Sequence, residues 1–464
     1  MSSKSLKILF QPADGIGHIN AAIGLAQALA NRGHQVFVFT LPNEIGTFKK
    51  FGLNEIHLQL TNEENNKKKN DSNDKKDADK DHPLKSSKET LERMSDAGIF
   101  SHRSSIDKID AYRAMIDVRD QTSHGYQRHQ QLKEIHPQMV TAIDKLKPDL
   151  IIADSCHFSL SPCIAYGKIP WIFLYSENPL SLFDSPNVPP PLSGYPTYDK
   201  TCWKEFREKF RKDYCESHCY AQNLINKELG YPEVDEKIPL LLSPYLNIYG
   251  FPEELDYTDL AKLPDNYVRM DTYCRKTAEK FELPDEFKKK IQPEDKLIYL
   301  SLGSMAGFDV ELMKRLVKIL GKTSHKYIVS KGILHDQYEL PDNMWGGPYV
   351  PQTEILPIVD MVITHGGNNT VSETLSFGKP MLVMPSFVDQ FDNAQRITEK
   401  GYGYRLDTYG FTDEELIETV DRILNDQQMK EKCKKAGERI QNSNSKEKAC
   451  EKIEELAEKF SKTN

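Results

Sequence analysis

The sequence lacks the features of a membrane, secreted or nucleic-acid-binding protein. No run of eighteen apolar residues is present, so no segment is long enough to cross a bilayer. The opening stretch MSSKSLKILFQPADG holds a four-residue apolar run, too short for the core of a signal peptide. The 61 basic residues are outnumbered by 69 acidic ones, and the net charge of -8 gives no general attraction for nucleic acid. We therefore expect a cytoplasmic protein with no membrane insertion and no nucleic-acid partner.

The sequence also lacks the cysteine pairs of a disulfide framework or a zinc site. Its eight cysteines include no CxxC pair, and in a long chain without a secretion signal we expect free thiols. The stretch CESHC (Cys215 to Cys219) could ligate a metal, but no second pair follows at zinc-finger spacing. No metal site is therefore expected.

What is present is an alternation of buried strands and amphipathic helices. A strand at Leu6–Gln11 is followed by a glycine-bearing turn, a helix that Gly33 ends, and a second strand at Gln35–Thr40. A strand, a helix and a strand within so few residues form a βαβ unit, which predicts a parallel sheet. The alternation restarts at Leu297. The fold class is thus α/β, with two Rossmann-like, doubly wound parallel-sheet domains that face each other across a cleft.

Composition changes suggest where the domains begin and end. We expect an N-terminal domain over 1–270, with a charged, low-complexity surface insertion at 62–89 that has too few apolar residues to order itself. A charged linker at 271–294 leads to a C-terminal domain over 295–445. Residues 446–464 should form a helix that packs back on the N-terminal domain. We expect a monomer.

Two polar residues should meet at the first domain's sheet edge. His18 lies in the turn DGIGHIN, where a helix N-terminus disfavours the imidazolium, so a neutral general base is one interpretation. A dinucleotide-binding loop or a capping histidine is another, although the third glycine of G-x-G-x-x-G is missing. Asp154 ends the apolar strand LIIAD and could orient His18 or cap a helix.

The second domain carries a denser polar cluster at its strand ends, within ITHGGNNTVSETLSFGKP and VDQFDN. Glycines let a backbone approach a ligand closely, and a helix N-terminus with hydroxyl and amide side chains suits a diphosphate. Carboxylate and amide groups suit the hydroxyls of ribose and a sugar. The candidate ligand residues of this domain are Ser304, at the strand end SLGS, and, within the cluster, His365, Gly367, Asn369, Thr370, Glu373, Asp389 and Gln390.

These motifs resemble those of the UDP-glycosyltransferases, a family with the two-domain GT-B fold. THGGNNTVSETLSFGKPMLVMPSFVDQFDN is close to the family's donor-binding signature. GHIN looks like the turn with the catalytic base, IIADS like the strand with its aspartate partner, and PYVPQ like the element that stacks uracil. The resemblance covers nearly the whole chain and is strongest between Leu297 and Asp407.

The resemblance implies a role for each matching residue. His18 would deprotonate the acceptor, and Asp154 would hold His18. Tyr349, in place of the usual tryptophan, would lie against uracil, and Lys331 would face the base or the phosphates. Val350 and Gln352 would lie near the base or ribose, and Glu373 would bind the ribose. Asp389 and Gln390 would contact the sugar. The diphosphate would be held by Ser304, His365, Gly367, Asn369 and Thr370.

The function that follows is inverting transfer of a hexose, with UDP-glucose as the co-substrate, to a hydroxyl of a small lipophilic acceptor. A phenolic, a flavonoid or a xenobiotic would be such an acceptor, and the role would be detoxification. No metal or other cofactor is expected. Two alternatives stay open: a sugar-nucleotide or lipophile binding protein without turnover, and an NAD-dependent oxidoreductase.

Overall fold

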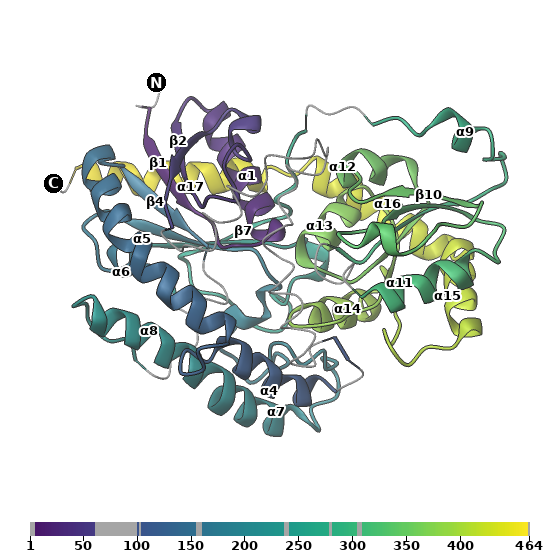
Figure 1. Ribbon diagram of the computed structural model, residues 1–464, viewed down its shortest axis with the longest axis horizontal. Coiled ribbons are helices and arrows are strands. Elements are labelled where there is room, and N and C mark those ends of the chain that lie inside the picture. Colours follow the sequence, from purple (N-terminus) through teal and green to yellow (C-terminus); the bar gives the residue numbers. More distant parts are fainter. Residues whose placement is uncertain are drawn as a thin grey trace, which may run out of the picture.

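The computed structural model describes residues 5–60, 100–101, 104–154, 160–235, 241–277, 281–303 and 309–462. The predicted insertion at 62–89 and Ser304 lie outside these residues. The chain forms two α/β lobes that lie side by side, the N-terminal half in one and most of the C-terminal half in the other (Figure 1). Each lobe is built on its own sheet, and both sheets are parallel throughout. The predicted fold class is confirmed.

The first sheet has seven strands in the order β3-β2-β1-β4-β5-β6-β7. Its central strands are apolar and buried on both faces because helices cover both sides. The strands are β1 (Lys7–Gln11), β2 (Gln35–Thr40), β3 (Asn54–His57), β4 (Leu150–Ala153), β5 (Trp171–Tyr175), β6 (Leu246–Gly250) and β7 (Tyr267–Met270).

Helices connect these strands and cover the two faces of the sheet. The first, α1 (Ile16–Asn31), buries the apolar face that its sequence predicts, and Gly33 follows it with a φ of 91°. The charged stretch from Trp203 to Glu228 is helical. The other helices of this lobe are η1 (Lys49–Phe51), α4 (Ser105–Ile116), α5 (His124–Leu146), α6 (Pro162–Ala165), η2 (Pro179–Leu182), α7 (Trp203–Lys209), the π-helix η3 (Phe210–Cys215), α8 (Glu216–Glu228) and η4 (Glu253–Leu255).

The second sheet has six strands in the order β10-β9-β8-β11-β12-β13. They are β8 (Leu297–Ser301), β9 (Lys326–Ser330), β10 (Met344–Gly347), β11 (Met361–Thr364), β12 (Met381–Val383) and β13 (Gly403–Arg405). The helices are α9 (Asp285–Lys288), α11 (Val310–Leu320), η5 (His335–Gln337), α12 (Gln352–Ile355), η6 (Leu356–Ile358), α13 (Asn368–Ser376), α14 (Gln390–Glu399), α15 (Asp413–Asn425), α16 (Gln427–Gln441) and α17 (Ser445–Ser461).

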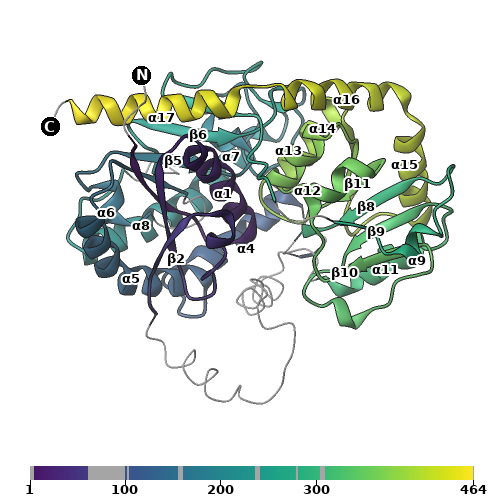
Figure 2. The ribbon, with the colours of Figure 1, turned by 90° about the horizontal axis from the view of Figure 1, so that it is seen from above.

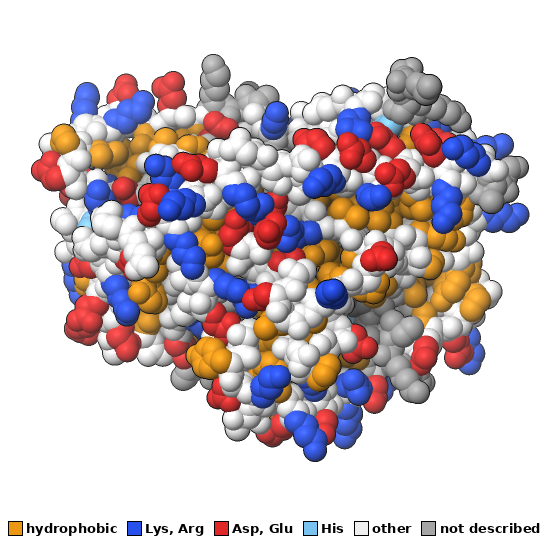
Figure 3. Space-filling model, turned by 180° about the vertical axis from the view of Figure 1, so that it is seen from behind, with side chains coloured by type: hydrophobic (Ala, Val, Ile, Leu, Met, Phe, Trp, Pro, Cys, Tyr) orange, Lys and Arg blue, Asp and Glu red, His pale blue; other side chains and the backbone are white. Residues whose placement is uncertain are grey.

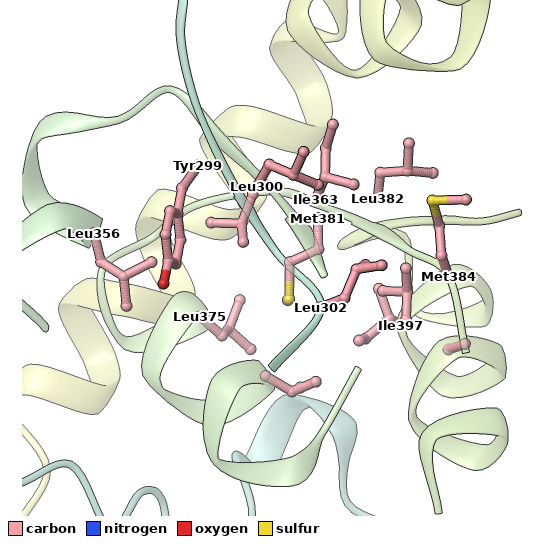
Figure 4. Packing of buried hydrophobic residues seen from close by; sticks show 14 of the residues in the cluster. Tyr299, Leu300, Leu302, Leu356, Ile363, Leu375, Met381, Leu382, Met384 and Ile397 are labelled. Atoms are coloured by element: carbon pink, nitrogen blue, oxygen red, sulfur yellow. The ribbon is translucent and has the colours of Figure 1, made fainter. Parts of the chain in front are cut away.

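Apolar side chains between the second sheet and its helices form a dense core. Figure 4 shows Leu375 of α13 and Ile397 of α14 on the side of the sheet to which Met381 points, whereas Ile363 and Leu382 extend from the other side, and all five are fully buried. This packing fixes the two helices whose N-termini lie at the carboxyl edge of the sheet.

The two last helices join the lobes. Figure 2 shows α16 and α17 running along one side of the molecule, from the second lobe across to the first. Helix α17 packs on α1 and β7, and Ala449, Ile453 and Ala457 are buried in the core of the first lobe. On the face opposite to that of Figure 1, basic and acidic side chains are interspersed (Figure 3).

Two glycines allow Tyr273 to pack tightly inside the first lobe. A Cβ on Gly24 of α1 would overlap the backbone carbonyl of Tyr273, and a Cβ on Gly250 would overlap its ring. The Tyr273 hydroxyl donates to the carbonyl of Tyr175 over 3.0 Å, at the end of β5. The position of α1 therefore depends on a residue without a side chain at 24.

We expect Gly24→Ala to destabilise the protein, because overpacking against a fixed backbone typically costs about 1–3 kcal/mol. Thermal unfolding would show this as a lowered midpoint, with Asn31→Ala on an exposed turn of the same helix as the matched control. An unchanged midpoint for Gly24→Ala would contradict the packing described here.

Candidate functional site

Three neighbouring strands of the first sheet bring three polar side chains to one edge. His18 is the third residue of α1, which follows β1, while Asp154 and Ser176 directly follow β4 and β5. Strand β1 pairs with β4, and β4 pairs with β5. The strand order reverses between β1 and β4, and such a switch point is where open α/β sheets bind ligands.

The three side chains form a hydrogen-bonded triangle. His18 Nδ1 lies 3.0 Å from Asp154 Oδ2 and 2.6 Å from Ser176 Oγ, and the Ser176 hydroxyl donates to Asp154 Oδ2 over 2.8 Å. Because that hydroxyl gives its proton to Asp154, its oxygen accepts from His18 Nδ1–H. The proton is thereby held on Nδ1, and Nε2 is the ring nitrogen that can take up a proton.

The charge state of His18 differs from the sequence-based prediction. Burial alone lowers the pKa of His18, but the charge and hydrogen bond of Asp154 and the charges of Glu177 and Asp389 together raise it to about 9. A pKa raised in this way favours the protonated ring at neutral pH, in contrast to the predicted neutral imidazole. The helix N-terminus disfavours the imidazolium, but its effect on the pKa is outweighed because carboxyl groups from three separate parts of the chain lie near the His18 ring.

The second sheet presents its own polar edge at β8, β11 and β12, which are also neighbours. His365 follows β11, and its ring lies between two glycines: a Cβ on Gly303 would overlap the ring, and one on Gly367 would lie 2.5 Å from Nε2. Burial lowers the pKa of His365 to about 4, so this ring is neutral. The glycines are thus needed to seat the histidine, a reason that the sequence did not reveal.

Helix α13 begins at this edge, with Gly367 as its N-cap residue. Gln352 donates to Glu373 Oε2 over 2.6 Å and lies 3.5 Å from the Thr370 hydroxyl. Arg275, from the segment between the two sheets, lies 3.8 Å from Glu373 Oε1, and Glu373 is 4% exposed. The structure therefore brings together three of the residues assigned to ribose and diphosphate and adds Arg275 to them.

The residues assigned to the base lie at the ends of β9 and β10. Tyr349 is 48% exposed, whereas Val350 is buried. The Lys331 ammonium donates to the carbonyl of Tyr338 over 2.8 Å and lies 4.8 Å from the centre of that ring. In this structure Lys331 is therefore engaged within its own domain.

Asp389 and Gln390 stand at the start of α14 and are buried. Asp389 Oδ2 accepts from the backbone N–H of Asn178, in the other lobe, over 2.9 Å. Burial, followed by the charge of Glu177, raises the pKa of Asp389 well above its ordinary value. Gln390 Oε1 accepts from the backbone N–H groups of Ser386 and Phe387, so it holds the loop after β12.

Val388, in that loop, has a φ of 45°, which is rare for a β-branched residue. Its N–H donates to the hydroxyl of Tyr112 in α4 over 2.7 Å, so a contact with the first lobe supports the strained backbone. Strain of this kind concentrates at functional sites.

The two polar edges face each other. Asn369 at the start of α13 donates to the carbonyl of Gly17 over 2.5 Å, one residue before His18. Asn368 donates to the carbonyl of Ser176 over 3.2 Å. The histidine of one lobe and the N-terminus of α13 in the other therefore lie at one site, and helix N-termini in general favour anions.

Sequence reasoning missed Ser176, Glu177, Asn178 and Arg275. The first three directly follow the apolar strand WIFLY, next to the strand that ends at Asp154, and that position is the signal that could have found them. Arg275 lies in the charged segment between the sheets, where the sequence pattern distinguishes no single residue.

The described part of the chain contains no group of His, Cys, Asp and Glu side chains that could hold a metal ion. Within the same residues, no helix is both long and apolar enough to span a membrane.

Comparisons with known proteins show what the chain resembles. Residues 255–439 match the family model for UDP-glucoronosyl and UDP-glucosyl transferase. An uncharacterized UDP-glucosyltransferase of Bacillus subtilis, YdhE, is 32% identical over 184 residues, which are 39% of this chain and 46% of that protein. UDP-glucuronosyltransferase 1A6 of Oryctolagus cuniculus is 27% identical over 220 residues, 46% of this chain and 39% of that protein. The matches thus span less than half the length of these relatives.

Solved structures share the fold over nearly the whole chain. The glycotransferase of kitacinnamycin has a TM-score of 0.67 at 17% identity, covering 98% of this chain and 100% of that one. The calicheamicin glycosyltransferase CalG4 has a TM-score of 0.63 at 18% identity, covering 98% of each chain.

We expect Asp154→Asn to lower the pKa of His18 from about 9, because the largest opposing charge is removed while the burial remains. NMR titration of the His18 ring would measure this. In the wild type, the folded state holds a proton more tightly than the unfolded state, whose pKa is 6.5. This contribution to stability is therefore complete below pH 6.5 and lost as the pH rises through 9.

The thermal midpoint should accordingly fall less steeply between these pH values in Asp154→Asn than in the wild type. An unchanged His18 pKa in the variant would contradict the triangle.

Proposed function

We propose that the chain belongs to the UDP-glycosyltransferase family, whose model matches residues 255–439, and that it is an inverting transferase of a hexose from a UDP-sugar. The acceptor would be the hydroxyl of a small lipophilic molecule such as a phenolic, a flavonoid or a xenobiotic, and the role would be detoxification. The observation that carries the proposal is the contact between the His18 turn and the start of α13, through Asn369 and Gly17.

The donor site is proposed for the second lobe. The diphosphate binds at the N-terminus of α13, where Gly367, Asn369 and Thr370 supply backbone N–H groups, an amide and a hydroxyl. Uracil stacks on the exposed ring of Tyr349. The ribose hydroxyls form hydrogen bonds with Gln352 and Glu373 in place of the hydrogen bond that joins these two side chains. Gln352 already lies beside Thr370 in the proposed diphosphate site.

The catalytic step is proposed as one displacement. Nε2 of His18 takes the proton of the acceptor hydroxyl while that oxygen bonds to the anomeric carbon and the bond from this carbon to UDP breaks. Asp154 and Ser176 hold the proton on Nδ1 and stabilise the imidazolium that forms. The helix N-terminus stabilises the charge on the departing UDP. Direct attack from the opposite side inverts the anomeric configuration.

UDP-glucose is the proposed donor because the sugar would lie among carboxyl groups. Asp389 is buried and bonded to the Asn178 N–H, next in the chain to Glu177, which is also buried. Carboxyl groups accept hydrogen bonds from neutral sugar hydroxyls, whereas the carboxylate of a glucuronyl group would be repelled at this place.

We predict that His18→Ala lowers kcat at least about a hundredfold, the low end for loss of a general base. Asp154→Ala should lower kcat as well, and the double variant should be little worse than His18→Ala because the two residues act as one unit. UDP affinity should survive in all three proteins. His325→Ala, at the surface pair with Asp421, is the control. Near-normal turnover by His18→Ala, or fully multiplicative losses, would overturn these roles.

We also predict a kcat/KM for UDP-glucose at least about tenfold above that for UDP-glucuronic acid, corresponding to roughly 1.4 kcal/mol. Glu177→Gln should narrow the ratio because it removes one of the repelling charges, while the affinity for UDP alone stays unchanged. Initial rates of UDP release with each donor measure the ratio. Equal or faster turnover of UDP-glucuronic acid by the wild type would refute this donor assignment.

A further inference from the structure

A small, partly open cavity of about 40 Å³ lies in the first lobe between the end of β1 and helices α4, α5 and α8. Apolar side chains, among them Leu132 and Ile135, form part of its wall. Gln11, the last residue of β1, and His129 of α5 line the same cavity. Neither polar residue belongs to the catalytic triangle or to the proposed donor site.

The cavity begins next to the proposed catalytic centre. The backbone carbonyl of Gln11 accepts from the N–H of Asp154 over 2.9 Å, so the two residues lie side by side on paired strands. Arg128, another lining residue, lies 3.8 Å from Asp14 in the turn that leads to His18. An acceptor whose hydroxyl lies at His18 therefore has this cavity beside it.

Two buried atoms in the wall lack hydrogen-bond partners among the described residues: Gln11 Oε1 and His129 Nδ1. His129 is 5% exposed, and its Nε2 lies 2.9 Å from Glu228 Oε2. Because a carboxylate only accepts, Nε2 carries the proton in the neutral ring, and Nδ1 is left as an acceptor. Both unpaired atoms therefore call for a ligand that donates a hydrogen bond.

We propose that this cavity receives a hydrogen-bond-donating group, a hydroxyl or an amine, at a second position of the acceptor molecule. The inference rests on the proposed function, because it places the attacked hydroxyl of the same molecule at His18. A space of roughly 10–15 Å³ already holds one water, so 40 Å³ admits a hydroxyl or amino group but not an aromatic ring. The substrate class is thus a bifunctional acceptor with an apolar body, such as a diphenol.

The test compares a dihydroxynaphthalene, with hydroxyls at opposite ends, with its monomethyl ether, which keeps one attackable hydroxyl. Binding of each probe to the full chain in the presence of UDP is measured by titration calorimetry. We expect the wild type to bind the diol at least about tenfold more tightly than the ether, because the ether has only one donor for two positions. Gln11→Met should weaken diol binding and shrink this ratio, whereas the control Gln130→Met, on the exposed side of α5, should keep it.

Equal affinity of the wild type for the two probes, or no binding of the diol, overturns the proposal without recourse to any variant. An unchanged ratio in Gln11→Met does so as well. UDP release from UDP-glucose with the diol is measured separately. If the diol binds more tightly than the ether but no UDP is released, the proposed function is contradicted and the role of the cavity is not. If both probes are turned over with equal kcat/KM and bind with equal affinity, only the role of the cavity is contradicted.

Discussion

Buried hydrogen bonds between the two lobes hold the carboxyl edges of their sheets face to face. Asn178 after β5 donates through its backbone to Asp389 and through its side chain to Asn393 over 2.8 Å. Asn368 at the start of α13 donates to the carbonyl of Gly250 over 2.8 Å, at the end of β6. Buried polar groups are costly when unpaired, so these bonds favour one relative position of the lobes over others. This position puts His18 opposite the N-terminus of α13, which are the proposed base and the proposed diphosphate site.

The same arrangement concentrates negative charge. Glu177, Asp389 and Asp392 lie near the junction, and burial raises the pKa of Asp392 to about 7. The charges of Glu177 and Asp389, with that of Asp154, act on His18: they favour its protonated form and, in the proposed mechanism, the imidazolium of the transition state. In such surroundings a smaller fraction of the histidine is neutral and able to accept a proton at neutral pH. The imidazolium that forms is, however, more stable.

The fold could be predicted from the sequence because its central strands are apolar on both faces and its helices are amphipathic, which are local properties. Strands such as β3 and β7 escaped prediction, since both are short and polar and are ordered by their neighbours. The polar residues that follow β1, β4, β11 and β12 could be named from the sequence because they come directly after apolar strands, and their site roles stay predictions. The charge of His18 was not foreseen, because Glu177 and Asp389 approach it only in the folded chain. The need for glycine at positions 303 and 367 was not foreseen either, because the His365 ring approaches them only in the folded chain.

The central claim is that His18 activates the acceptor oxygen for direct attack on a sugar bound to the opposite lobe. The anomeric configuration of the product tests this most directly. Proton NMR of the glycoside formed from UDP-glucose, recorded early in the reaction, reports the coupling of the anomeric proton. The account predicts a β-glucoside from the α-linked donor. An α-glucoside would contradict it, since retention requires a second displacement or a different base.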